Sequence, residues 1–337
     1  SRPFRLDTHD VYVTASAGIS LYPDDGEDAK DLFKNADTAM YRAKQQGKDT
    51  YRFYTEEMNM EDRERLELEN QLRKAIDQDY LVLYYQPRVN ILTGEIIGME
   101  ALLRLEHPQL GTVLPDQFIS IAEDTGLIIP IGKWVLRTVC QQHKAWSKQG
   151  LSVPQISINM SGRQFMDPNL VENINEIIEE TGVAAKDLEL ELTETFLMEN
   201  PTRTIIILGE LKWIGFNISI DDFGTAYSSL AYLKRFPIDR LKIDRSFISD
   251  IPDDPDDMAI TKSIIAMAKS LNLWIVAEGV ETESQLSFLK AQGCQEVQGN
   301  YFSCPLNVEA ATELLQKEQM TDSRGAKITG IRGDKSS

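Results

Sequence analysis

Residues 217–247 read NISIDDFGTAYSSLAYLKRFPIDRLKIDRSF. The β-branched run Ile218–Ile220 predicts a short strand that ends in two adjacent carboxylates, Asp221 and Asp222. A second short strand is expected at Leu241–Asp244, after a helical segment. In α/β proteins, the loops that leave the carboxyl ends of parallel strands converge on active sites. The stretch therefore predicts an α/β fold with ionisable groups at its strand ends, and the alternative is a solvated acidic turn that caps the next helix.

The chain of 337 residues is acidic, with a net charge of −18 and a pI near 4.7. This charge argues against partners such as duplex nucleic acid and against contact with an anionic membrane. The three cysteines (Cys140, Cys294 and Cys304) have no metal-site spacing, which favours a reducing compartment. No apolar run is long enough to span a bilayer. We expect a cytoplasmic location for this chain, and attachment to a membrane through segments outside it stays open.

The first part of the chain, residues 1–54, is expected to be the end of an α+β domain. Val11–Ile19 alternates like a buried strand, Ala36–Lys48 has a helical pattern that Gly47 ends, and Tyr51–Tyr54 is expected as a last strand. A piece of this size has little core of its own.

Residues 55–77 are dense in charge and predict a solvated connecting helix. Leu68, Leu72 and Ile76 recur every four residues and give it one apolar face. The alternative is that this helix transmits a signal between domains or pairs with a second copy of the chain.

From residue 78 to residue 318 the sequence alternates between strand and helix patterns. Leu81–Arg88 and Glu95–Leu105 are expected strands, and the link Asn90–Gly94 is too short for a crossover helix. The two strands should form a hairpin, so one of them runs antiparallel to the rest. Six further strands are expected, at Gln155–Met160, Leu188–Thr193, Asn217–Asp222, Arg240–Asp244, Leu273–Ala277 and Glu296–Phe302.

Helices are expected between these strands, at residues 116–122, 131–148, 168–181, 201–213, 228–234, 258–271, 283–292 and 308–318. Eight strands with helices between them, over this length, predict a (β/α)8 barrel of the TIM type with an irregular antiparallel first strand. A doubly wound sheet is the alternative. The polar residues 319–337 are expected to be a disordered tail.

Every expected barrel strand except the first delivers polar residues at or near its end. They are Glu100, Asn159, Glu191, Glu194, Asp221, Asp222, Lys242, Asp244, Glu278, Glu281 and Gln298. Packing alone does not explain this pattern, because buried carboxylates need cations or hydrogen bonds. The strand-end residues therefore indicate a site at one face of the barrel.

The candidate ligands at these ends are rich in oxygen and include no histidine or cysteine. They are Glu100, Asn159, Glu191 and Asp221, with Asp222 and Glu278 as further candidates. Hard oxygen ligands select Mg²⁺ or Mn²⁺, and the excess of carboxylate suggests two ions suited to displacement at phosphorus. Lys242, amid carboxylates, should keep its proton and position the attacking water. Arg104 is a candidate phosphate ligand, and a salt bridge on the barrel rim is its alternative role.

Two known families share these motifs. Residues 13–29 (VTASAGISLYPDDGEDA) and 32–54 resemble the C-terminal part of a GGDEF (diguanylate cyclase) domain, without its signature. The later part of the chain resembles the EAL family in the motifs EALLR (100–104), NMS (159–161), ELTE (191–194), DDFGT (221–225), KID (242–244), AEGVE (277–281) and QG (298–299).

The EAL resemblance implies a bacterial phosphodiesterase that hydrolyses cyclic di-GMP to linear pGpG with Mg²⁺ or Mn²⁺, and a homodimer. The metal ligands that it implies are Glu100, Asn159, Glu191, Asp221, Asp222 and Glu278. Its catalytic residues are Glu100, Lys242 and Glu278, of which the last two hold the attacking water. Its substrate-binding residues are Leu103, Arg104, Asp244 and Gln298. Glu194 and Glu281 are implied to anchor the loop after Asp222.

The sequence departs from the EAL pattern at Ala226, where glycine is usual, and at Asn300 and Cys304 near the expected pocket. If position 226 needs a positive φ angle, alanine there costs stability. None of the three departures removes a metal ligand. Two alternatives stay open: a non-catalytic receptor for cyclic di-GMP, and a barrel that acts on another phosphodiester.

Overall fold

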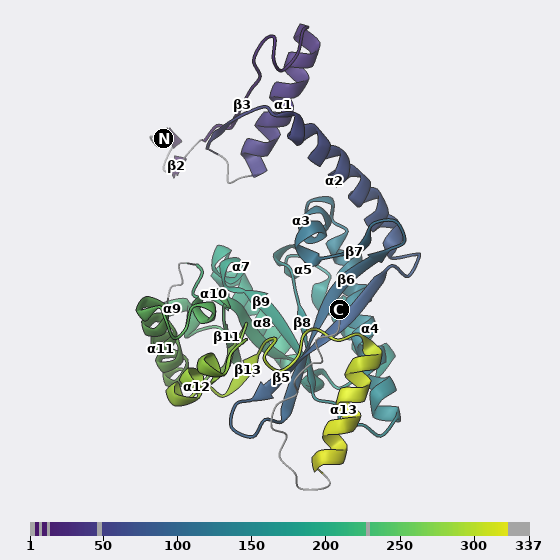
Figure 1. Cartoon of the computed structure of the whole chain (residues 1–337), viewed down its shortest axis with the longest axis vertical. Helices are drawn as coiled ribbons and strands as arrows, with labels where there is room; N and C mark the ends of the chain where they lie inside the picture. Colours follow the sequence, from purple (N-terminus) through teal and green to yellow (C-terminus); the bar gives the residue numbers. More distant parts are fainter. Residues whose placement is uncertain (1–3, 7–8, 12–13, 46–48, 227–229, 323–337) are drawn as a thin grey trace. The chain divides into compact units, whose positions relative to one another are not determined.

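The computed structural model describes residues 4–6, 9–11, 14–45, 49–226 and 230–322 (Figure 1). The chain divides into two compact units between Lys74 and Ala75. This boundary falls inside the charged segment 55–77, where α2 (Glu56–Ala75) forms as a single long helix. No helix among the described residues is both long enough and apolar enough to cross a membrane.

The first unit contains two small sheets. β1 (Phe4–Leu6) pairs antiparallel with β2 (His9–Val11), and β3 (Ala17–Ile19) pairs parallel with β4 (Tyr51–Phe53). The expected single strand Val11–Ile19 is therefore wrong, because β2 ends at its first residue and β3 forms only its last three positions.

α1 (Ala29–Gln45) contacts β3 through a close backbone approach at Gly18. A Cβ atom at Gly18 would lie 1.9 Å from the carbonyl oxygen of Ala36, so only glycine fits there. The helix begins at Ala29 and not at Ala36 as expected, and its expected end at Lys48 lies outside the described residues.

The second unit is built on a closed ring of eight strands. They are β5 (Leu81–Asn90), β6 (Ile96–His107), β8 (Gln155–Asn159), β9 (Leu188–Thr193), β10 (Asn217–Phe223), β11 (Arg240–Ile243), β12 (Trp274–Ala277) and β13 (Glu296–Gln298). The ring closes because β5 pairs antiparallel with both β6 and β13, while the other neighbours pair in parallel. The predicted barrel with an antiparallel first strand is confirmed, and the doubly wound sheet is excluded.

Helices follow the parallel strands and form an outer layer around the ring (Figure 1). They are α3 (Pro115–Thr125), α4 (Ile128–Lys148), α5 (Gly162–Phe165), α6 (Leu170–Thr181), α7 (Glu194–Glu199), α8 (Pro201–Ile214), α9 (Leu230–Leu233), α10 (Ser246–Ser249), α11 (Pro255–Ser270), α12 (Glu283–Gln292) and α13 (Val308–Asp322). A short strand that was not expected, β7 (Gly111–Val113), extends β6. α13 runs to Asp322, which corrects the expectation that disorder begins at residue 319, and residues 323–337 lie outside the described part.

Local sequence signals set the helix ends, as α8 illustrates. The side chain of Asn200 accepts a hydrogen bond from the backbone of Arg203, and Pro201 occupies the first helical position. The helix ends at Gly215, whose φ of 113° is open to glycine but strained for other residues.

Alternation along the parallel strands sends leucines outward and charges inward. On β9, Leu188, Leu190 and Leu192 pack under the helices, and Glu189 and Glu191 lie on the opposite side, inside the barrel. All five side chains are buried. The interior of this barrel is therefore charged, and it is organised in layers.

The layer toward the amino ends of the parallel strands, here called the arginine layer, consists of Arg88, Glu189, Arg240 and Glu296. Arg88 contacts Glu189 at 2.8 Å and Glu296 at 2.9 Å, and Arg240 pairs with the same two carboxylates. Gly98 makes room for this layer, since a Cβ there would lie 2.7 Å from Arg88 Nη2. The buried Arg88, the partly buried Arg240 and two buried glutamates leave the layer electrically neutral.

We predict that Arg88→Met lowers the free energy of unfolding of the barrel by about 3–5 kcal/mol, because it leaves two buried carboxylates facing a single arginine. Urea unfolding followed by tryptophan fluorescence measures this loss. The fluorescence reports only the second unit, which contains all four tryptophans: Trp134, Trp146, Trp213 and Trp274.

The matched control is Arg137→Met, at the exposed ion pair between Arg137 and Glu180. This change should cost less than about 1 kcal/mol, because water screens exposed pairs. Equal losses in the two variants would show that the arginine layer does not stabilise the barrel.

Candidate active site

The second charged layer lies at the carboxyl ends of the parallel strands and is here called the lysine layer. It consists of Lys242 on β11 with the carboxylates of Glu100, Glu191, Asp221 and Glu278. Lys242 and Glu191 each lie two positions after a member of the arginine layer on the same strand, so alternation brings them to the same interior. The structure brings together the strand-end residues that the sequence singled out.

Lys242 is completely buried and contacts all four carboxylates. The distances from its Nζ are 2.6 Å to Glu191, 2.7 Å to Glu278, 3.2 Å to Asp221 and 3.4 Å to Glu100. A single ammonium group thus faces four acids. Unlike the arginine layer, this layer has an excess of negative charge when its acids are ionised.

The excess charge shifts the pKa values of the layer. Burial raises the pKa of Glu191 to about 7 against the attraction of Lys242, and Glu100 and Asp221 add to the rise. The pKa of Glu278 is raised well above its usual range, first by burial. Burial alone would lower the pKa of Lys242, but the four carboxylates hold it well above its ordinary value. Lys242 and its hydrogen bonds lower the pKa of Glu100 against its burial, with help from Gln298 and Asn159. Lys242 therefore stays protonated, and the protons that the layer holds near neutral pH, when no other cation is near, are on Glu278 and Glu191.

The oxygen atoms of the site fit a divalent cation. Ligand atoms of Asp221, Asp222 and Glu278 all lie within 4.8 Å of one another. Among the described residues, Glu191 Oε1 is a buried acceptor with no hydrogen-bond donor. Because unpaired buried acceptors are costly, a cation at this point would satisfy an atom that the protein leaves open.

The loop after β10 is held in an unusual backbone conformation. Asp222 has a φ of 54°, a conformation that non-glycine residues adopt rarely, and Gly224 has a φ of 105°. The buried Glu194 accepts a hydrogen bond of 2.7 Å from the backbone N–H of Gly224. Burial raises the pKa of Asp222 to about 6, with further contributions from Asp221 and Asp244.

The suspected cost of alanine at position 226 is not supported by the backbone. The described non-glycine residues with positive φ are Asp49, Asp79, Asp222 and Asn272. Ala226 is not among them, so alanine fits there without backbone strain. The strain of this loop lies at Asp222 instead.

Two amide side chains hold Glu100 from opposite sides. Asn159 Nδ2 donates to Glu100 Oε1 at 2.5 Å, and Gln298 Nε2 donates to Glu100 Oε2 at 2.6 Å. Gln298 also donates to Gln86 Oε1 at 3.1 Å. The sequence analysis missed Gln86, because it found no polar group on the first strand. The expected hairpin could have revealed this residue, since the register pairs Gln86 with Glu100.

The remaining expected site residues lie around this centre. Arg104 lies 6.0 Å from the ring centre of Tyr84, and its Nη1 donates to the carbonyl oxygen of Leu103 at 2.8 Å. Within the described residues Arg104 forms no ion pair, which does not support the rim salt bridge. Asp244 accepts hydrogen bonds from Ser246 at the start of α10. Glu281 is exposed, in contrast to the buried Glu194.

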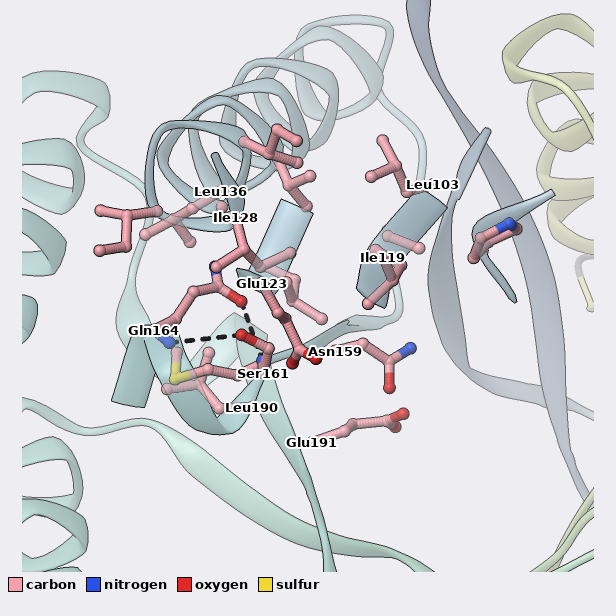
Figure 2. Close-up of a pocket in the computed structure, with 18 of the residues that line it drawn as sticks. Leu103, Ile119, Glu123, Ile128, Leu136, Asn159, Ser161, Gln164, Leu190 and Glu191 are labelled. Atoms are coloured by element: carbon pink, nitrogen blue, oxygen red, sulfur yellow. Dashed lines mark hydrogen bonds between the residues drawn. The ribbon is translucent and has the colours of Figure 1, made fainter. Parts of the chain in front are cut away.

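A pocket of about 660 Å³ opens beside the lysine layer. Figure 2 shows Asn159 and Glu191 at one end of this pocket, and Leu103, Ile119 and Ile128 around the other. The pocket therefore combines an acidic end that could hold metal ions with an apolar end. Such a shape suits a ligand that carries both a phosphodiester and a flat base.

The sequence matches two known families. Residues 69–305 match the EAL domain, and residues 1–50 match the diguanylate cyclase, GGDEF domain. Among curated relatives, the bifunctional diguanylate cyclase/cyclic di-GMP phosphodiesterase MucR of Pseudomonas aeruginosa is 46% identical over 309 residues, covering 92% of this chain and 45% of that protein. The cyclic di-GMP phosphodiesterase PdeR of Escherichia coli is 38% identical over 304 residues, covering 90% and 46%.

The solved structures agree with the sequence comparison. The PaMucR phosphodiesterase in complex with c-di-GMP is 45% identical, with a TM-score of 0.71, and the match covers 73% of this chain and 99% of that one. The EAL enzyme Bd1971 in its form bound to cAMP and cyclic di-GMP is 37% identical, with a TM-score of 0.69, covering 75% and 69%. The chain spans less than half the length of the curated relatives named above. With its barrel, its motifs and these matches, the chain belongs to the EAL domain family.

Proposed function

We propose that this chain hydrolyses cyclic di-GMP to linear pGpG. The observation that carries the proposal is the lysine layer, in which one buried ammonium group faces four carboxylates beside a pocket with an apolar end. Relatives named as cyclic di-GMP phosphodiesterases, and a related structure in complex with c-di-GMP, support this substrate.

The proposed cofactor is Mg²⁺ or Mn²⁺, with two ions. The excess carboxylate and the unpaired Glu191 Oε1 support this choice, because hard cations prefer oxygen ligands. The residues that would hold the ions are Glu100, Asn159, Glu191, Asp221, Asp222 and Glu278. Once bound, such ions lower the pKa of a bound water and offset charge on phosphoryl oxygens.

The side chains then orient the reactants. Lys242 keeps its proton, so it donates hydrogen bonds and does not act as a base. Glu278 has a side chain that is 16% exposed and lies 2.7 Å from Lys242, so a water molecule next to this pair could contact both groups. Attack by that water on phosphorus forms one P–O bond and breaks the bond to the O3′ oxygen, which takes up a proton.

The rest of the pocket would hold the nucleotide. Arg104, half-buried with its guanidinium group free of ion pairs among the described residues, is placed to bind phosphate. Leu103 belongs to the apolar end, where a guanine base would pack. Asp244 and Gln298 complete the proposed substrate contacts.

The organisation of the chain is part of the proposal. We assign residues 1–54 to the C-terminal part of a GGDEF-like domain and 55–77 to a connecting helix. The phosphodiesterase barrel, expected at 78–318, is extended to residue 322 because α13 continues to Asp322. A homodimer and a cytoplasmic location are proposed from the family resemblance alone. The roles of Glu194 and Glu281 as anchors of the loop after Asp222 are proposed too, and the Glu194–Gly224 hydrogen bond supports the first.

The first experiment is chromatographic detection of pGpG from cyclic di-GMP, with Mg²⁺, Mn²⁺, Ca²⁺ and EDTA in parallel. We expect product with Mg²⁺ or Mn²⁺ and none with EDTA. Glu100→Ala should abolish turnover, while Glu180→Ala, at an exposed position on α6, should not. Nucleotide binding without metal and without product would place the chain among the receptors. Faster turnover of another cyclic dinucleotide would show that cyclic di-GMP is not the preferred substrate.

Removing the loop anchor should weaken metal binding. We expect Glu194→Ala to fold normally and to need about 10–100 times more Mg²⁺ for half-maximal rate, because the Gly224 N–H loses its acceptor and Asp222 loses its fixed position. Glu199→Ala, at an exposed position of the same helix, is the control. An unchanged Mg²⁺ titration in Glu194→Ala would rule out the anchoring role.

The raised pKa values predict how pH acts on the metal-free protein. A carboxyl group whose pKa is higher in the folded state than in the unfolded state binds more protons in the folded state at pH values between the two. The stability of the fold therefore falls as the pH rises through this range, the window of pH dependence. Glu191, whose pKa is raised from its ordinary value of 4.5 to about 7, places the window between these two values.

Calorimetry should therefore show a lower melting temperature for the metal-free protein at about pH 8 than at about pH 5. Glu191→Gln should flatten this dependence, and added Mg²⁺ should raise the melting temperature most at the higher pH. A metal-free stability that rises across the window would contradict the assigned shifts.

A further inference from the structure

The antiparallel strand β5 carries a polar side chain into the site that the mechanism above does not use. Gln86 lies opposite Glu100 in the register of β5 and β6, and it is half-buried. Because β5 runs against its neighbours, Arg88 points into the arginine layer and Gln86 reaches the lysine layer. The strand that closes the ring therefore contributes to both layers.

One hydrogen bond connects Gln86 to the backbone of Ser303, and two more connect it through Gln298 to a carboxylate of the lysine layer. Gln86 Nε2 donates to the carbonyl oxygen of Ser303 at 3.0 Å. Gln86 Oε1 accepts from Gln298 Nε2 at 3.1 Å, and the same nitrogen of Gln298 donates to Glu100 Oε2 at 2.6 Å. This series, Ser303–Gln86–Gln298–Glu100, is called the amide relay below.

The relay has only one consistent orientation. A backbone carbonyl oxygen accepts hydrogen bonds and cannot donate, so Ser303 requires the Nε2 end of Gln86 to face it. The Oε1 end of Gln86 then faces Gln298 and requires a donor there. With Gln298 reversed, its amide oxygen would face both the amide oxygen of Gln86 and the carboxylate of Glu100, which is repulsive. Each amide thus fixes the next.

The start of the relay is a rigid reference. Tyr85 exchanges two backbone hydrogen bonds with Leu306, of 2.7 Å and 2.9 Å, so the segment after β13 is tied to β5 next to Ser303. The end of the relay is equally constrained, because Asn159 Nδ2 donates to the other oxygen of Glu100 at 2.5 Å. The carboxylate plane of Glu100 is therefore set from both sides.

We propose that Gln86 is a positioning residue: it fixes the amide orientation of Gln298, and through it the carboxylate of Glu100, for metal binding and hydrolysis. The inference rests on the proposed function for its catalytic consequence. Gln86 itself does not contact the metal ions or the nucleotide. Groups that orient a metal ligand in this way commonly change metal affinity or activity by about 10–100-fold when removed.

The first test needs no activity. In the metal-free protein labelled with ¹⁵N-glutamine, the side-chain amide signals of Gln298, assigned by their loss in Gln298→Leu, should exchange slowly with water. Gln86→Leu should shift these signals and speed their exchange. If they stay unchanged in Gln86→Leu, Gln86 does not orient Gln298 and the proposal is overturned, whatever the enzyme's activity.

The second test separates positioning from substrate contact. Gln86→Leu should lower kcat about tenfold or more and weaken Mn²⁺ binding, measured by calorimetry on the protein alone, and these losses should exceed any rise in KM that follows from the substrate contact proposed for Gln298. The double variant of Gln86→Leu and Gln298→Leu should lose no more than the worse single variant, because the two residues act as one unit. A rise in KM alone, or losses that multiply, would overturn the proposal.

Gln155→Leu is the matched control. Gln155 forms a similar relay at the opposite end of the barrel, where it donates to the carbonyl oxygen of Lys186 and accepts from Arg240. This variant should keep kcat and Mn²⁺ affinity, and equal effects in Gln155→Leu and Gln86→Leu would show a general loss of stability instead. Wild-type protein that binds no Mn²⁺ and makes no pGpG would refute the proposed function, while the NMR test of the relay would still stand.

Discussion

The imbalance of charge around Lys242 is the constraint on which the site depends. A closed barrel removes its interior from water, so charges inside it must be compensated by other charges or by protons. The arginine layer meets this demand with two arginines and two glutamates. The lysine layer, nearer the carboxyl ends of the parallel strands, does not meet this demand, because four carboxylates share one ammonium group. The remaining negative charge must be compensated by protons or by bound cations. This uncompensated charge is what makes the lysine layer a candidate cation site.

Closure of the ring creates both layers, and the reversed strand β5 makes closure possible. β5 pairs with β6 through a tight hairpin and with β13 at the seam, so the first and last strands of the barrel are joined. Reversal also sets the contents of the layers, because Arg88 points to the amino ends of the other strands while Gln86 points to their carboxyl ends. The irregular start of the barrel is therefore part of the site.

The sequence predicted the polar residues at or near the carboxyl ends of the parallel strands and missed the arginine layer and Gln86. Asp221 and Glu278 follow short apolar runs, and this position identifies a strand end whatever the tertiary structure. Glu189 and Arg240 alternate with apolar residues along their strands, and the same pattern is found in strands whose polar face is in water. Only closure of the barrel brings these two residues together in its interior. The extent of α13 was missed because polar residues at a helix end read like a tail. The conformation of the loop after β10 has no local signal, since Gly224 in this loop bonds to Glu194, thirty positions earlier in the chain.

The choice of cation in each layer follows from the same physics. Arginine presents several N–H donors in a planar fork, and in the arginine layer each arginine contacts two carboxylates. Lysine is a compact point charge with three donors, so at position 242 it cannot occupy all the oxygens of four acids. Glu191 shows the result: one of its oxygens lies 2.6 Å from Lys242, and the other has no partner among the described residues. A guanidinium group at this position would offer five N–H donors in place of three and would satisfy more of these oxygens. Lysine neutralises part of the charge and leaves some carboxylate oxygens without a donor. A layer that only stabilises the fold has no use for such oxygens, whereas a metal site requires them.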